Sequence, residues 1–333
     1  MDIDVVVMWV DGNDPEWIRE KEKYSPMRSD DSDTVIRYRD WGVMKYWFRS
    51  IEKYMPWVRK VHFVTWGHIP DFLDADNPKL NIVKHDEFMD RAVLPCFNSS
   101  AIEMNIFRIP DLAEHFVFFN DDMFVTKPLS PDCFFVNDLP CQYYAEIPMI
   151  FEGAPRNFQM VTMNILRIIN NHFEKRKCFK KHRKKYISPK YPLADNIRSI
   201  FLRLFNPYFM TGFRNYHMPA PLLKATFKEI WEKEPEVLEA LASHRFRDAA
   251  DVNHWLALWW QLMSGSFVPK KNHCRYYEIS IHTIDQICEA ITKGEYEMIC
   301  INDADSQLDY NYLSKRIQAA FEEKLPQKSS FEV

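Results

Sequence analysis

Short apolar runs that end in turn residues organise the first 150 residues of the chain. Four such runs, each the length of a buried strand, lie at 5–10, 61–65, 81–83 and 116–119. Apolar residues over 44–55 recur at spacings of three and four, which predicts an amphipathic helix that ends at Pro56. A second helix is expected over 98–109, capped by Asn98 or Ser99. Strands that alternate with helices indicate an α/β fold with a mostly parallel sheet.

The second half of the chain has a mainly helical pattern. Residues 160–216 are rich in basic residues and proline, and predict an inserted helical region or a mobile flap. Helical spacing dominates 219–263, and 298–301 is one more short strand before a terminal helix. We therefore expect a single domain over 1–333. Its parts are an α/β half at 1–150, a basic helical insertion at 160–216 and a helical part at 217–333 that returns to the sheet.

The charge balance excludes one class of partner. A formal net charge of −4 argues against nucleic acid as a partner. The local exception is the basic run from Lys175 to Lys185. This run is either a solvated helix face or a docking patch for a membrane surface or an anionic acceptor.

Cysteine usage and hydropathy indicate the compartment. Seven cysteines without a Cys-x-x-Cys pair argue against a disulfide framework or a zinc site, and they fit a reducing cytoplasm. No apolar stretch reaches the ~18 residues of a membrane span, and the N-terminus has no signal-peptide pattern. We expect a cytoplasmic protein whose contact with the inner face of the membrane is peripheral.

Two Asn-Asp pairs follow apolar runs directly. Asn120-Asp121-Asp122 comes after the run at 116–119, and Asn302-Asp303 comes after 298–301. Adjacent carboxylates behind a rigid strand suit a hard divalent cation, which would neutralise a diphosphate. The alternative is turn chemistry with Asx hydrogen bonds. The pattern predicts Mg²⁺ or Mn²⁺ held by Asp121 or Asp122, joined by Asn302 or Asp303.

Several other residues are candidates with a structural alternative. His217 titrates near neutrality and suits proton transfer, although a lone histidine is more often packed or solvated. The guanidinium of Arg247 could bind phosphate oxygens with two parallel hydrogen bonds, or it could pair with a nearby aspartate. Arg37 and Arg39, just before Asp40, present the same choice. Trp9, beside the turn at Asp11 and Gly12, could stack on a base or belong to the core.

Four blocks, in order and spanning almost the whole chain, resemble the signatures of the Stealth family of sugar-phosphate transferases. The first is 4–17, from Asp4-Val5-Val6-Val7-Met8-Trp9-Val10-Asp11-Gly12 onward. The second runs from Arg37-Tyr38-Arg39-Asp40 to Phe119-Asn120-Asp121-Asp122. The third is His217-Met218-Pro219 with Arg247 and Asp251 downstream, and the fourth is Ile301-Asn302-Asp303 followed by 326–332.

The resemblance implies a Rossmann-like, glycosyltransferase-A-like core, a UDP-sugar donor and Mg²⁺ or Mn²⁺. By motif position, Asp122, His217 and Arg247 match residues of the family's active site. The first two blocks would bind the donor through Trp9, Asp11, Gly12, Arg37, Arg39 and Asp40. Trp41 and Ser100 depart from residues that are common in the family, asparagine and histidine, which leaves the sugar and the acceptor open.

The function expected from this resemblance is transfer of a sugar 1-phosphate in capsule or surface polysaccharide synthesis. A hydroxyl of a glycan or lipid-linked glycan attacks the sugar-proximal phosphorus of the UDP-sugar, and UMP leaves. His217 or Asp122 is the general base. One alternative is a metal-dependent glycosyltransferase, which attacks the sugar carbon and releases UDP. The other is a non-catalytic glycan-binding protein that uses the carboxylates and tryptophans as a cleft.

Overall fold

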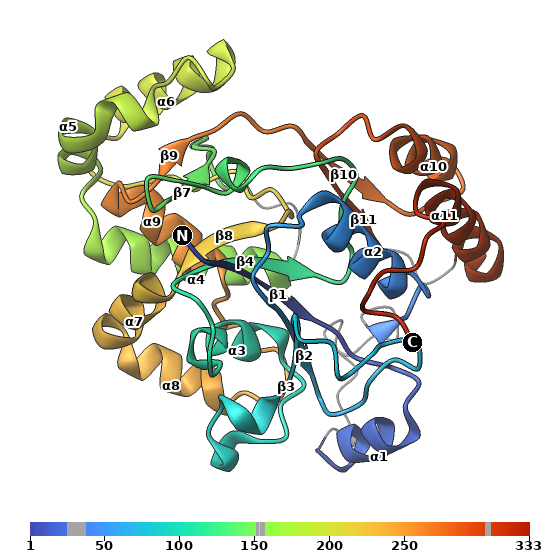
Figure 1. Cartoon of the computed structure of the whole chain (residues 1–333). Coiled ribbons are helices and arrows are strands. Elements are labelled where there is room, and N and C mark those ends of the chain that lie inside the picture. Colours follow the sequence, from blue (N-terminus) through green and yellow to red (C-terminus); the bar gives the residue numbers. More distant parts are fainter. Residues whose placement is uncertain (25–37, 151–152, 154–156, 304–307) are drawn as a thin grey trace.

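A five-stranded sheet in the order β3-β2-β1-β4-β8 lies at the centre of the computed structural model (Figure 1), which describes residues 1–24, 38–150, 153, 157–303 and 308–333. Four strands run parallel, and β8 pairs antiparallel with β4. The strands are β1 (Ile3–Met8), β2 (Val61–Thr65), β3 (Leu80–Lys84), β4 (His115–Asn120) and β8 (Ala220–Leu223). The expected α/β class with a mostly parallel, Rossmann-like sheet is confirmed.

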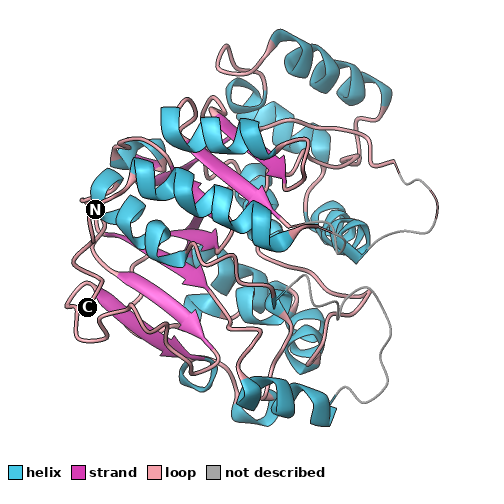
Figure 2. Ribbon diagram, turned by 90° about the vertical axis from the view of Figure 1, so that its right-hand side faces the viewer, coloured by secondary structure: helices cyan, strands magenta, loops and turns pink. Residues whose placement is uncertain are grey.

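Helices cover both faces of this sheet, which explains the continuous apolar runs of its strands. Alternate side chains of β1 enter two different cores, Val5 and Val7 in one and Val6 in the other. The first layer, in front of the strands in Figure 2, contains α2 (Met44–Tyr54), α10 (Ile284–Lys293) and α11 (Tyr310–Lys324). The second contains α3 (Ser99–Glu103), α4 (Asn157–His172), α7 (Lys224–Lys233), α8 (Pro235–Ser243) and α9 (Trp255–Ser264).

A second sheet continues the chain beyond β4 and brings the two Asn-Asp pairs together. It has the order β10-β11-β5, with β5 (Met123–Val125), β10 (Cys274–Glu278) and β11 (Met298–Asn302). β11 pairs antiparallel with β5, and Ile301 N donates to Asp122 O at 2.8 Å. Asn302, the last residue of β11, and Asp303, the next residue, therefore lie beside the Asp121-Asp122 turn.

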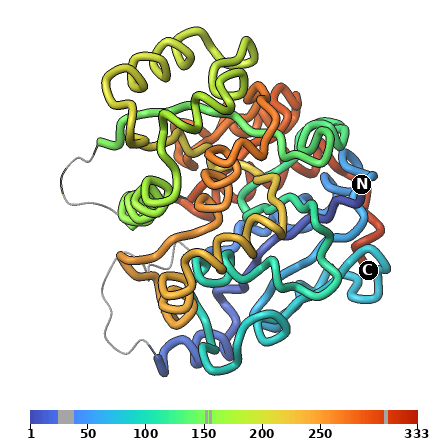
Figure 3. The backbone as a smooth tube through the Cα atoms, turned by 90° about the vertical axis from the view of Figure 1, so that its left-hand side faces the viewer, coloured from blue at the N-terminus to red at the C-terminus, as the bar shows by residue number. Residues whose placement is uncertain are grey.

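The remaining elements lie around these two sheets. A small third sheet contains β6 (Phe135–Val136), β7 (Leu139–Gln142) and β9 (Val268–Pro269), and α1 (Pro15–Tyr24) follows β1. The basic insertion forms α5 (Lys175–Tyr186) and α6 (Leu193–Phe205), which lie with α4 between β7 and β8 in the chain. Figure 3 shows α5 and α6 at the end of the molecule away from α1. Of the helices described, none has the length and apolar character needed to cross a membrane.

Two elements differ from the sequence pattern. The helix expected over 98–109 ends at Glu103, and a single 3₁₀ turn follows at Ile106–Arg108. Asn105 Nδ2 donates to Ala101 O at 2.9 Å, so its side chain occupies the carbonyl that a continuing helix would use. The strand β8 falls inside the region expected to be helical. It is a four-residue edge strand with Pro221 in it, and an edge is where a sheet tolerates proline.

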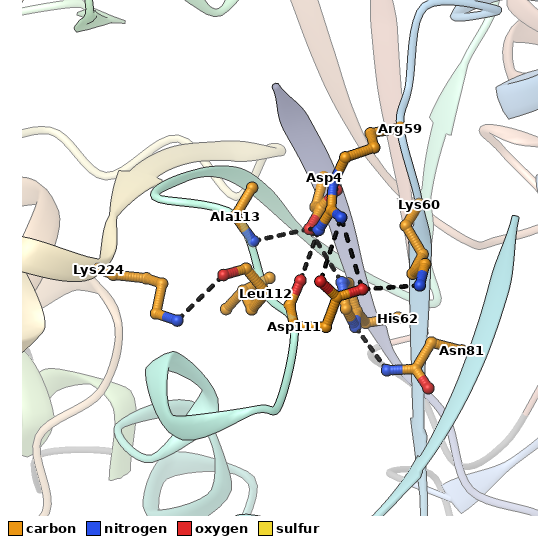
Figure 4. Close-up of polar contacts among 9 residues, drawn as sticks. All are labelled: Asp4, Arg59, Lys60, His62, Asn81, Asp111, Leu112, Ala113 and Lys224. Carbon is orange, nitrogen blue, oxygen red and sulfur yellow. Dashed lines mark hydrogen bonds and ion pairs between the residues drawn. The ribbon is translucent and has the colours of Figure 1, made fainter. Parts of the chain in front are cut away.

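A buried charge cluster joins the amino ends of the strands (Figure 4). Asp4 of β1 is fully buried, and its carboxylate accepts hydrogen bonds from Arg59 Nη2 at 2.6 Å and Ala113 N at 2.7 Å. His62 Nε2 of β2 lies 3.0 Å away. Burial alone would raise the pKa of Asp4, but the hydrogen bonds from His62, Arg59 and Ala113 hold it below its usual value. The cluster therefore fixes the end of the sheet opposite the candidate site.

Candidate functional site

A cleft of about 1620 Å³ opens at the carboxyl ends of β1, β2 and β4. This is the edge at which open α/β sheets bind ligands. Most of the residues singled out in the sequence line it. They are Trp9, Arg39, Asp40, Asp121, Asp122, His217, Arg247, Asn302 and Asp303. Arg37 lies outside the described residues, and Asp11 and Gly12 are not among the lining residues.

The two carboxylates after β4 have different surroundings. The side chain of Asp121 is exposed to the cleft, but the surrounding protein partly desolvates its carboxylate. That desolvation, with the nearby carboxylates of Asp122 and Asp40, raises the pKa of Asp121 to about 7. Asp122 Oδ2 accepts a hydrogen bond from Cys300 Sγ at 3.2 Å. Asp122 Oδ1 is buried and has no hydrogen-bond partner within the described part of the chain.

His217 pairs with the second of these carboxylates. Its Nε2 lies 3.2 Å from Asp122 Oδ2 and 3.4 Å from Asn120 Nδ2. Burial lowers the pKa of His217, but the Asp122 carboxylate outweighs that effect, so the net shift is upward. His217 comes from the loop before β8, and its partner from the turn after β4. A carboxylate that orients an imidazole is an arrangement suited to acid–base chemistry.

Arg39 places a positive charge beside the carboxylate of the second Asn-Asp pair, Asn302-Asp303. Arg39 Nη1 lies 3.3 Å from Asp303 Oδ2, and Trp41 Nε1 donates to the same oxygen at 3.2 Å. Trp41, the departure from the family pattern, thus holds this carboxylate in place. The carboxylate of Asp303 thus contacts the guanidinium of Arg39 and the indole of Trp41, whereas the carboxylates of Asp121 and Asp122 line the cleft.

The Trp9 turn lies on the side of the cleft next to β2. Trp9 is 9% exposed and stacks on Phe63, and the edge of its ring contacts His68. Asp11 N donates to His68 Nε2 at 2.8 Å. An ideal Cβ on Gly12 would lie 2.1 Å from Tyr38 O, so only glycine lets the segment before Arg39 pack here. Asp11 and Gly12 therefore lie behind the cleft wall and support it.

Arg247 lies on another wall, beside the start of α3. Its Nη2 donates to Ser99 Oγ at 2.8 Å. Asp251, the aspartate that could have paired with it, instead accepts hydrogen bonds from Asn98 Nδ2 at 2.8 Å and from Asp248 N at 2.9 Å. The buried Asp251 thus joins the Arg247 loop to the cap of α3.

Sequence reasoning missed a second carboxylate–histidine pair in the cleft wall. His254 Nδ1 lies 2.6 Å from Glu103 Oε2, and both side chains are almost fully buried. His254 Nε2 has no hydrogen-bond partner within the part of the chain that is described. The two residues are 151 positions apart, and nothing in the pattern around His254 marks it. Only the position of Glu103 inside the second block could have drawn attention to the pair.

The donor set fits a hard divalent cation. Ligand atoms of Asp122, His217 and Cys300 lie within 4.8 Å of one another. Burial and the Asp122 carboxylate raise the pKa of Cys300 well above its usual value, and a soft sulfur ligand does not suit a hard cation. The oxygens of Asp121 and the unsatisfied Oδ1 of Asp122 are the ligands that Mg²⁺ or Mn²⁺ prefers.

Comparison with known proteins identifies the class. Residues 1–29 match the model of Stealth protein CR1, conserved region 1, and residues 37–142 match that of Stealth protein CR2, conserved region 2. The chain is 38% identical to the capsular polysaccharide phosphotransferase WcwK of Streptococcus pneumoniae, over 99% of this chain and 98% of that protein. It is 36% identical to the exopolysaccharide phosphotransferase cps2G of Lactiplantibacillus plantarum, over 99% of this chain and 96% of that protein.

Among solved structures, an active-site mutant of LgtC covers 97% of this chain and is itself covered in full, at 10% identity and a TM-score of 0.36. A score this low does not define the fold, so the fold class is assigned from the strand order of this chain alone. The full-length similarity defines a phosphotransferase of surface-polysaccharide synthesis. The chain belongs to the Stealth family.

Proposed function

We propose that the cleft transfers a sugar 1-phosphate from a UDP-hexose or UDP-N-acetylhexosamine to a hydroxyl of a glycan or lipid-linked glycan. The acceptor oxygen attacks the phosphorus next to the sugar, and the bond from that phosphorus to the bridging oxygen of the diphosphate breaks. The sugar keeps its phosphate in a new phosphodiester, and UMP leaves. The observation that carries the proposal is that the Asp122–His217 pair shares one cleft with Arg39 and Arg247.

The Asp122–His217 pair accepts the proton of the attacking hydroxyl. The hydrogen bond between them orients the imidazole, and a positioned group of this kind contributes about 10²–10⁴ to a rate. We assign the pair as the acid–base unit of the reaction. Its location at the end of β4, a buried strand, keeps it in place while the acceptor binds.

Cationic groups stabilise the charge that develops during transfer. Phosphoryl transfer spreads negative charge over the equatorial oxygens, so groups such as Arg247 favour it when they contact those oxygens. Mg²⁺ or Mn²⁺, held by Asp121 and Asp122 with Asn302 or Asp303 nearby, would neutralise the diphosphate. Attack at the sugar carbon, as in a glycosyltransferase, has less need of an arginine beside the phosphorus.

The donor is bound on the Trp9 side of the cleft. We assign Trp9, Arg39 and Asp40 to the nucleotide, with Gly12 acting behind them through its packing against Tyr38 and Asp11 through its hydrogen bond to His68. Arg37, outside the described residues, belongs to the same proposal by its place in the second block. The chain acts as one catalytic domain at the inner face of a membrane, in peripheral contact with it.

The experiment that tests this function follows the phosphorus. The enzyme is given a UDP-sugar labelled at the sugar-proximal phosphate, a glycan acceptor and Mn²⁺, and the nucleotide products are separated. Label in the glycan with stoichiometric UMP supports the proposal. Label that remains in UDP identifies a glycosyltransferase instead, and no release of nucleotide with any UDP-hexose or UDP-N-acetylhexosamine identifies a binding protein. The variant His217→Ala serves as the blank.

A further inference from the structure

The helix α6 presents its apolar face to solvent. Its buried side chains, Asp195, Ser199 and Leu202, lie on one side of the helix. The opposite side carries exposed apolar residues at helical spacing, which are Leu193, Ile197, Ile200, Phe201, Leu204 and Phe205. Leu204 and Phe205 are 75% and 79% exposed. An amphipathic helix on a globular protein normally has the reverse orientation, with the apolar stripe toward the core.

Polar contacts fix this orientation. Asp195 accepts hydrogen bonds from Tyr143 and Arg198, and Arg214 Nη1 lies 3.7 Å from it. Lys175 Nζ of α5 donates to Leu202 O at 3.1 Å. The polar face of α6 is thus held against the protein by specific partners, and its apolar face points outward as a consequence.

Positive charge surrounds the apolar face. The neighbouring α5 carries exposed basic side chains, which are Arg176, Lys177, Lys180, Lys181, Arg183 and Lys184. Asp195 is the one acidic residue in 175–209, where it is buried and paired, and Glu174, just before α5, pairs with Lys177. Figures 1 and 3 both show α5 and α6 next to each other at one end of the molecule. We call the exposed residues of these two helices the α5–α6 surface.

We propose that the α5–α6 surface docks on a bilayer that contains anionic phospholipids. The apolar side chains of α6 enter the interface, and the lysines and arginines of α5 contact lipid phosphates. A second copy of the chain is a poor occupant, because it would bring two dense positive patches together without acidic side chains to pair them. An anionic bilayer offers both an apolar interior and complementary charge.

The docking surface is coupled to the cleft through Arg214. This residue lines the cleft, lies three positions before His217 and pairs with Asp195 of α6. Docking would therefore hold the cleft at a fixed place relative to the membrane. The benefit to a lipid-linked acceptor rests on the proposed function, whereas the binding of lipid does not.

Sedimentation with vesicles tests the proposal. Vesicles of phosphatidylcholine, with and without phosphatidylglycerol, are mixed with the full chain at low and at physiological salt. Wild type should bind the anionic vesicles, and more weakly as salt rises. Leu204→Ser with Phe205→Ser should weaken binding at least about tenfold. Lys180, Lys181 and Lys184 changed to Gln should reduce the dependence on phosphatidylglycerol, since half of the exposed basic side chains of α5 are then neutral.

Control variants remove an exposed apolar side chain or exposed lysines from other parts of the surface. Ile281 is 59% exposed, so Ile281→Ser tests loss of an exposed apolar side chain, and Lys228→Gln with Lys315→Gln tests loss of charge. These variants should bind as wild type does. All variants should transfer sugar phosphate to a small water-soluble acceptor at the wild-type rate, so a failure of the proposed function would show there and not in the sedimentation.

Hydrogen exchange provides a second measurement that needs no variant. Anionic vesicles should protect amides of residues 193–205 in wild type and leave those of α10 unchanged. Absence of binding to anionic vesicles at low salt overturns the proposal, as does equal binding by the Leu204 and Phe205 double variant. A dimer that this double variant converts to a monomer, without any binding to vesicles, would show that a second copy is the occupant.

Discussion

His217 Nε2 lies 3.2 Å from Asp122 Oδ2, although 95 positions separate the two residues in the chain. Asp122 lies in the two-residue turn between β4 and β5, and His217 lies just before β8, the strand that pairs antiparallel with β4. The strand pairing therefore creates the carboxylate–imidazole pair. Because β4 and most of β8 are buried, the pair has the rigid support that acid–base catalysis requires.

His217→Ala should lower turnover by about 10²–10⁴ and leave the melting temperature close to that of wild type. His217 lines the cleft through polar contacts to Asp122 and Asn120, so its removal should leave the packing of the sheet intact. UMP release and thermal unfolding are measured on the same samples. His282→Ala, an exposed histidine outside the cleft, is the control. A His217→Ala enzyme with a near-normal rate, or one that melts far lower, would assign the residue a structural role.

Arg247→Ala should reduce kcat/KM by about 10²–10³, the loss typical of one group that stabilises transition-state charge. Arg247→Lys keeps the charge but loses the planar fork, so it should fall between alanine and wild type. Steady-state kinetics with varied UDP-sugar measure both. The control is Arg91→Ala, since the Arg91 side chain is 84% exposed and lies outside the cleft. If Arg247→Lys and Arg247→Ala lower the rate equally, the planar geometry of the guanidinium matters and its charge alone does not.

The sequence could predict those parts of the site whose residues form a recognisable pattern with their neighbours in the chain. Asn120-Asp121-Asp122 and Asn302-Asp303 were visible because an apolar run that ends in carboxylates is an unusual local pattern. The Glu103–His254 pair was invisible, since each residue alone looks like an ordinary helix or loop position. Periodicity likewise predicted helices in 160–216 but not the outward apolar face of α6. Which side of a helix is covered depends on tertiary contacts such as Asp195 with Arg214.

Removal of metal should abolish turnover, and Mg²⁺ or Mn²⁺ should restore it. Asp121→Asn should prevent that recovery, because it removes a carboxylate that we assign to the cation. The same change should raise the melting temperature of the chelated protein, since it removes repulsion between Asp121 and the carboxylates of Asp122 and Asp40. Thermal unfolding with chelator and with Mn²⁺ measures this reversal. Asp71→Asn, at an exposed carboxylate outside the cleft, should change neither property. Full activity after dialysis against chelator would exclude a required cation.

Asp4→Asn should destabilise the fold in a pH-dependent way. Asp4 is fully buried, accepts hydrogen bonds from Arg59 and faces the buried His62. Its neutral replacement therefore removes the negative charge on the sheet side of this cluster and leaves Arg59 with Asp111 as its acidic partner. The loss in unfolding free energy at pH 7 should be about 3 kcal/mol, as for other buried pairs that lose one partner. Asp111→Asn is the control, because Asp111 pairs with the same Arg59 but is 57% exposed. Its effect should be much smaller.

The pH dependence follows from the direction of the shift at Asp4. Its pKa in the folded protein is below the usual value near 3.8, so the folded state binds this proton more weakly than the unfolded state. The stability that the ionised Asp4 contributes is therefore complete above about pH 5 and is lost as the pH falls below 3.8 toward the folded pKa. Urea unfolding of wild type and Asp4→Asn from pH 7 to pH 3 should show two curves that converge in acid. Curves that stay parallel over this range would mean that Asp4 acts through packing and not through its charge.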